Sequence, residues 1–132
     1  MSYPKLYVAF FRPFFGNYQH WALYLDNEEE QLIFEVTGEH PDFERNVQKS
    51  PPDLLDGFLH TLYVGVIDRN DIHAVTQVAE TVFVDNETFE WDCQEYVLDI
   101  LDRLEEEYVL DCDDEDYQDA REVLRDERGA ML

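Results

Sequence analysis

The chain has 132 residues, of which 45% are hydrophobic and 14% aromatic. This length and composition predict one domain, spanning residues 1–132, with enough apolar side chains to bury a core. Nine lysines and arginines stand against 32 aspartates and glutamates, so the formal net charge is −23. A field of this sign works against direct binding to nucleic acid or to an anionic membrane surface. It favours a basic partner, or no macromolecular partner.

No apolar run approaches the length of a membrane span. The first apolar run ends at Arg12 and Pro13 and is too short for a signal peptide. We therefore expect a cytoplasmic protein whose two cysteines, Cys93 and Cys112, are free thiols.

Five stretches have the composition of β-strands. Residues 6–11 form a short apolar run that reads as a buried strand. Residues 20–25 and 31–37 flank an acidic turn, which predicts a hairpin. Further strands are expected over residues 43–48 and 59–67. A regular pleat directs His20, Ala22 and Tyr24 to one face of the sheet and Trp21, Leu23 and Leu25 to the other, so a histidine begins a central strand.

Helical periodicity appears in the second half of the chain. It predicts helices over residues 72–80, over residues 93–108 and over residues 117–128, the last within an acidic C-terminal segment of about 113–132. The apolar face of the middle helix contains Val97, Ile100, Leu101, Leu104 and Tyr108. Because strands precede helices with short connections, we expect an α+β fold with a small, mostly antiparallel sheet packed against helices.

Cys93 is the residue on which the functional interpretation centres. It opens the middle helix and shares its apolar face. In a first helical turn, unpaired backbone N–H groups and the positive end of the helix dipole favour thiolate over thiol. The alternative interpretation is a small hydrophobic core residue, which is the commonest role of a buried free cysteine.

A histidine on a strand and a cysteine at a helix start are the two groups that thiol-based acyl transfer requires. The imidazole takes the thiol proton and returns it to the leaving group, while helix-start N–H groups stabilise the oxyanion. His20 and Cys93 have this placement.

The segments His20-Trp21-Ala22-Leu23-Tyr24-Leu25 and Asp92-Cys93-Gln94-Glu95-Tyr96-Val97 also carry a family resemblance. Together, and in this order, they resemble the circularly permuted papain-like proteins, the NlpC-type superfamily that includes the lecithin:retinol acyltransferase-like enzymes. The resemblance covers roughly residues 5–110 and implies the permuted papain-like fold.

The resemblance also implies residue roles. Cys93 would be the nucleophile and His20 the base. The family's third polar residue stands on the following strand, where Glu35 is the best candidate and Gln31 and His40 are alternatives. Asp92 replaces the family's asparagine and places beside the sulfur a negative charge that opposes thiolate formation. The second histidine typical of the acyltransferases is absent from the equivalent strand, and we find no hydrophobic C-terminal anchor of the kind seen in the lipid-acting members. A small amide, ester or peptide is therefore at least as suitable a substrate as a lipid.

Aromatic side chains near the two motifs are candidates for substrate binding. Phe14, Phe15 and Tyr18 precede His20, and Trp91 precedes Cys93. The four histidines and two cysteines have no metal-binding spacing, and the acidic run 111–116 lacks the glycine and terminal glutamate of an EF-hand loop. The sequence therefore predicts neither a metal nor another cofactor.

Two functional classes follow from these patterns. The first is a cysteine-dependent hydrolase or acyltransferase, which acts on an amide, ester or thioester of a small molecule or peptide through a thioester intermediate. The second is a catalytically inactive acidic binding protein on the same scaffold, which binds a basic partner or mimics nucleic acid.

Overall fold

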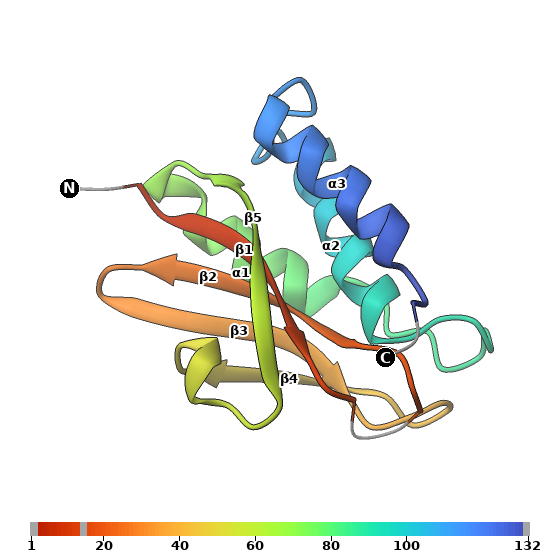
Figure 1. Ribbon diagram of the computed structural model, residues 1–132. Coiled ribbons are helices and arrows are strands. Elements are labelled where there is room, and N and C mark those ends of the chain that lie inside the picture. The colour runs from red at the N-terminus through yellow and green to blue at the C-terminus, as the bar shows by residue number, and fades with distance from the viewer. Residues whose placement is uncertain (1–2, 14–15, 131–132) are drawn as a thin grey trace.

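The computed structural model describes residues 3–13 and 16–130 and shows an α+β fold, as the sequence predicts (Figure 1). Five antiparallel strands form one sheet in the order β4-β3-β2-β1-β5. The strands are β1 (Lys5–Phe11), β2 (His20–Asn27), β3 (Glu30–Thr37), β4 (Glu44–Lys49) and β5 (Phe58–Val66).

Three α-helices follow the sheet in the chain. They are α1 (Ile72–Thr81), α2 (Cys93–Glu106) and α3 (Glu115–Glu127), and two short 3₁₀ turns lie at Pro52–Leu54 and Arg69–Asp71. Helix α2 packs on β2 and β3, α1 packs on α2, and α3 packs on β5. Within the described ranges, none of the helices is long and apolar enough to cross a lipid bilayer.

The expected alternation of β2 is present. Trp21, Leu23 and Leu25 are at most 1% exposed and belong to the main core, which also contains the apolar faces of all three helices. Ala22 and Tyr24 point to the other face, where they join a smaller apolar cluster.

Two helix boundaries differ from the sequence prediction by two residues, and the ends of α1 and α3 differ by one. Helix α2 ends at Glu106 instead of reaching Tyr108, which has a φ of 59° and is 93% exposed. The chain turns there because the N–H groups of Val109 and Leu110 both donate to the Leu104 carbonyl, which brings two more apolar side chains into the core. Helix α3 starts earlier than expected, at Glu115, because the Asp114 carboxylate caps it.

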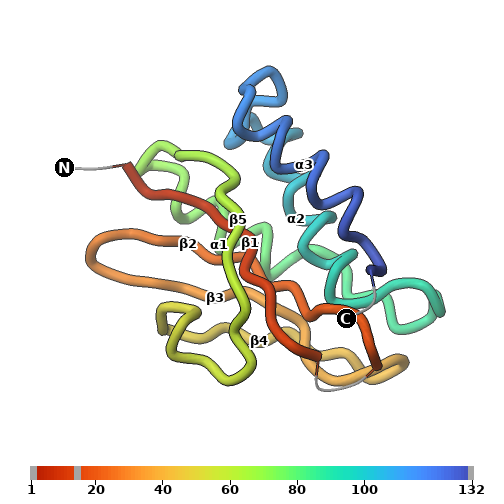
Figure 2. Tube along the Cα trace, viewed as in Figure 1, coloured from red at the N-terminus to blue at the C-terminus, as the bar shows by residue number. Residues whose placement is uncertain are grey.

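The start of α2 lies beside the start of β2 (Figure 2). A side-chain contact fixes this arrangement, because Nε2 of the fully buried Gln94 donates a 2.8 Å hydrogen bond to the backbone carbonyl of Gln19. Asp92 begins the helix by accepting hydrogen bonds from the N–H groups of Gln94 and Glu95. The first residue of α2 is thereby held next to the first residue of β2.

The core predicts a clear contrast between two substitutions. Ile100→Ala removes a side chain that is 0% exposed, so it should lower the free energy of unfolding by about 2–5 kcal/mol. Val123→Ala, at a site 41% exposed on α3, should change it by less than about 1 kcal/mol. Urea unfolding followed by circular dichroism measures both values, and equal effects would contradict this description of the core.

Candidate active site

His20 of β2 and the buried Glu35 of β3 form a partly buried pair. Nε2 of His20 lies 2.7 Å from Oε1 of Glu35. Glu35, the best candidate for the third polar residue, therefore contacts His20, whereas the catalytic roles of the two residues stay predictions. Neither alternative third residue contacts the imidazole: Gln31 accepts a hydrogen bond from the Tyr24 hydroxyl, and the ring of His40 packs edge-on against Phe89.

Strand β4 holds Glu35 in place. The second carboxylate oxygen, Oε2, accepts hydrogen bonds from Asn46 at 2.8 Å and from Gln48 at 2.7 Å. Burial by itself raises the pKa of Glu35, but the hydrogen bonds from His20, Gln48 and Asn46 outweigh it and hold the pKa below its ordinary value. Glu35 is therefore a fixed carboxylate at neutral pH.

Cys93 approaches the same imidazole from α2. The thiol is 6% exposed, and it lines with His20, Tyr18 and Phe43 a cavity of about 40 Å³, which is large enough for water. Both side chains line this cavity, and interaction with Cys93 is one of the influences that raise the pKa of His20. Because Glu35 engages Nε2, the ring nitrogen left for the sulfur is Nδ1.

The two partners change the protonation of His20. Burial favours the neutral ring, but the hydrogen bonds and negative charges of Cys93 and Glu35 outweigh burial and raise the pKa of His20 to about 9. The ring is therefore cationic at neutral pH. An imidazolium between a sulfur and a carboxylate can stabilise a thiolate and later return a proton to a leaving group.

The Asp92 carboxylate has a positively charged partner in the structure, which its position in the sequence does not indicate. Its carboxylate caps α2 and also lies 3.2 Å from the guanidinium of Arg128, which follows α3. A basic side chain thus offsets the negative charge beside the sulfur. Sequence reasoning missed Arg128 because its partner lies 36 residues away and no local pattern links them.

Sequence reasoning also missed Asn46 and Gln48. They alternate along β4, so they share one face of that strand, and the pairing of Glu35 with Asn46 aligns this face with the carboxylate. Polar residues at alternate positions of a predicted strand were the available signal. Their meaning depends on the β3–β4 register, which the sequence leaves open.

The predicted substrate-binding residues divide into two groups. Phe14 and Phe15 lie outside the described residues. Tyr18 lines the small cavity and also, together with Trp91, a wider adjoining groove of about 500 Å³. Trp91 is 7% exposed and donates a hydrogen bond from its indole to Asp99, so it contributes mainly a fixed wall. Phe89, on the rim of this groove, is 83% exposed.

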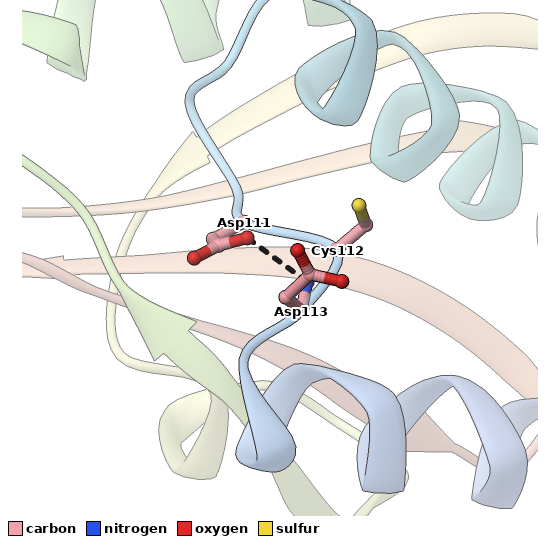
Figure 3. A group of neighbouring side chains, drawn as sticks. All are labelled: Asp111, Cys112 and Asp113. Carbon is pink, nitrogen blue, oxygen red and sulfur yellow. Dashed lines mark hydrogen bonds between the residues drawn. The ribbon is translucent and has the colours of Figure 1, made fainter.

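A group of potential metal ligands lies elsewhere, between α2 and α3. The side-chain ligand atoms of Asp111, Cys112 and Asp113 lie within 4.8 Å of one another (Figure 3). All three residues are exposed, and the Asp111 carboxylate accepts a hydrogen bond from the backbone of Asp113. These are properties of a solvated acidic turn, and we assign no metal to it. Cys112, like Cys93, is a free thiol.

The fold and the site together define an α+β protein with a cysteine, histidine and glutamate cluster at the start of a helix. The chain belongs to the family of unknown function DUF6540, whose model matches residues 6–111. No curated protein and no solved structure matches the chain. The matched range contains Cys93, His20 and Glu35, and it ends before α3.

The His20 pair predicts a pH-dependent contribution to stability. The pKa of His20 is raised from 6.5 to about 9, so the stabilisation is complete below pH 6.5 and is lost as the pH rises through 9. Its upper limit is roughly 3 kcal/mol. The difference in unfolding free energy between the wild type and His20→Gln should therefore shrink between pH 6 and pH 9.5. Urea titrations at several pH values measure it, and His73→Gln, on the exposed side of α1, is the control.

Proposed function

We propose that this protein is a cysteine-dependent hydrolase or acyltransferase that forms a thioester on Cys93. The observation that carries the proposal is the placement of the His20 ring, which is hydrogen-bonded to Glu35 and lines the same cavity as Cys93, together with its raised pKa. A nucleophile, a base and an orienting acid placed in this order are the arrangement that thiol-based acyl transfer uses.

In the first half of the reaction, the Cys93 thiolate attacks the carbonyl carbon of an amide, ester or thioester. The carbon–sulfur bond forms, and the protonated His20 gives its proton to the leaving nitrogen, oxygen or sulfur as the original bond breaks. In the second half, water or an acceptor amine or alcohol gives a proton to His20 and attacks the thioester. The carbon–sulfur bond breaks, the acyl product leaves, and the Cys93 thiolate is restored beside the protonated His20. Glu35 keeps the ring oriented and stabilises its cationic form.

The oxyanion would be stabilised by donors at the start of α2. Asp92 occupies the N–H groups of Gln94 and Glu95, so the backbone N–H of Cys93 is the donor nearest the sulfur. Tyr18 lines the same cavity as the thiol. Burial, together with the charges of Asp92 and Cys93, raises the pKa of Tyr18, which keeps its hydroxyl protonated and able to donate.

The order of these elements supports a circularly permuted papain-like scaffold. The base stands on β2, the orienting acid on the next strand and the nucleophile on a later helix, which is the order that the His20 and Cys93 motifs predict. The antiparallel sheet with helices after it is compatible with this scaffold.

The shape of the site favours a substrate whose acyl group is small at the reacting carbon. The cavity beside the thiol is about 40 Å³, whereas the adjoining groove, with Phe43, Phe89 and Trp91 in its lining, is about 500 Å³. A small molecule or a peptide with an apolar portion can occupy such a groove and present its carbonyl to Cys93.

The net charge of −23 supports the second candidate function, a binding protein for a basic partner. Electrostatic association of this kind should weaken as salt rises from about 0.05 M to 0.5 M, because the Debye length shortens. A pull-down at both salt concentrations tests it. Partners retained equally at both would argue against electrostatic recruitment.

The enzyme proposal predicts selective reactivity of Cys93. At pH 7 the thiol should react with iodoacetamide and form a thioester with an activated ester, and His20→Ala should slow both reactions by about 10- to 100-fold because the proton carrier is lost. Mass spectrometry of the peptide containing Trp91 to Leu101 measures the products. His73→Ala is the matched control, and Cys112→Ser removes the second thiol. An unreactive Cys93, or one indifferent to His20, would leave the binding function as the better description.

A further inference from the structure

The residue that follows α3 contacts the helix start that carries Cys93. Arg128 makes hydrogen bonds and ion pairs with four residues there, at separations of 2.8–3.3 Å. The acceptors are both carboxylate oxygens of Asp92, the carboxylate of Glu95, the side-chain oxygen of Gln94 and the backbone oxygen of Glu90. The backbone N–H of Gly129 adds a 2.8 Å bond to the same Gln94 oxygen.

These contacts join two elements that are distant in sequence but adjacent in space. Figure 1 shows the end of α3 coming down beside the start of α2. Gln94 is 0% exposed and links three segments, since its amide nitrogen bonds Gln19 and its oxygen bonds Arg128 and Gly129. The Arg128 guanidinium therefore helps to fix the position of the first turn of α2, and it also offsets the negative charge of that turn.

The charged groups around the Cys93 sulfur determine how the positive charge of Arg128 acts on it. From α2 and its cap, Asp92 and Glu95 place two carboxylates in the turn that contains Cys93. The loops contribute Tyr18 and Glu39 to the lining of the cavity, and β2 contributes His20, with Glu35 of β3 behind it. Within the described residues that surround this turn, Arg128 is the guanidinium that contacts both carboxylates. Without it, two negative charges would oppose thiolate formation.

Arg128 also lies outside the range of residues that the family model matches. The matched range ends at residue 111, whereas α3 begins at Glu115. The three clustered residues lie inside that range, so the C-terminal helix adds to the site a component that the family match does not include.

We propose that Arg128 is a positioning residue for Cys93, which neutralises Asp92 and fixes the first turn of α2 so that the thiol can ionise beside His20. The inference rests on the proposed function of Cys93 as the nucleophile. Arg128 reaches the reacting sulfur only through Asp92 and Gln94, so its effect is electrostatic and geometric. The C-terminal helix thereby supports the reactivity of a residue on α2.

The test measures the rate constant of Cys93 alkylation by iodoacetamide from pH 5.5 to 9.5 in a Cys112→Ser background. Arg128→Met should lower the rate at pH 7 by roughly three- to tenfold and move the whole profile to higher pH, because the two carboxylates are left uncompensated. Arg128→Lys, which keeps the charge but loses the planar fork, should recover part of the rate. Arg125→Met, at an exposed site three residues earlier on α3, should match the parent.

A second pair of variants separates charge from folding. Asp92→Asn keeps a side chain that caps helices well but removes the charge that Arg128 offsets. If Arg128 acts through that charge, the loss caused by Arg128→Met should be at least halved in the Asp92→Asn background. A structural role alone predicts the same loss in both backgrounds, with a lower melting temperature and no shift of the pH profile.

The outcomes also distinguish this inference from the proposed function. If Cys93 depends on His20 but Arg128→Met matches Arg125→Met, the assignment of Arg128 is wrong and the enzyme proposal stands. If Cys93 is indifferent to His20, the proposed function fails first. A loss that Asp92→Asn leaves unchanged would overturn the electrostatic role.

Discussion

The buried carboxylate of Glu35 is the constraint on which the site depends. A carboxylate that is 5% exposed needs hydrogen-bond donors, because an unpaired buried charge costs several kcal/mol. Two strands supply them: Asn46 and Gln48 from β4, and His20 from β2. Satisfying this one group aligns three strands and fixes the orientation of the imidazole. The same contacts that stabilise the sheet therefore set the chemistry of the ring.

The other half of the site depends on how α2 begins. Its apolar face, with Val97, Ile100 and Leu101 fully buried, holds the helix against the sheet. The first turn is then placed by polar contacts, from the Asp92 cap to the Gln94 bridge and the guanidinium of Arg128. The hydrogen bonds that fix the first turn of α2 thus place the buried Cys93 thiol near the cationic imidazole of His20. Apolar packing determines which face of α2 lies against the sheet, and the polar contacts determine where its first turn lies.

Charge acts in this protein at long range, through the net charge, and at short range, through individual ion pairs. Globally, the net charge of −23 favours basic partners and repels polyanions. Locally, the acidic groups near Cys93 are offset, since His20 faces Glu35 and Arg128 faces Asp92. Short-range pairing in a half-buried setting is screened less than the long-range field. An acidic sequence can therefore contain a site in which a cysteine sulfur lies beside a cationic side chain.

The sequence by itself determined the α+β class, the alternation of β2 and the amphipathic face of α2, because these follow from local periodicity. It also indicated His20 and Cys93 as candidates through two motifs, and the family resemblance of these motifs left Glu35 as the best of three candidates for a third residue. Only the tertiary structure decided that Glu35, rather than Gln31 or His40, meets the imidazole, because strand register is set by pairing. It also decided the end of α2 before Tyr108 and the neutralisation of Asp92 by Arg128. Those outcomes depend on contacts between residues far apart in the chain, which local pattern does not encode.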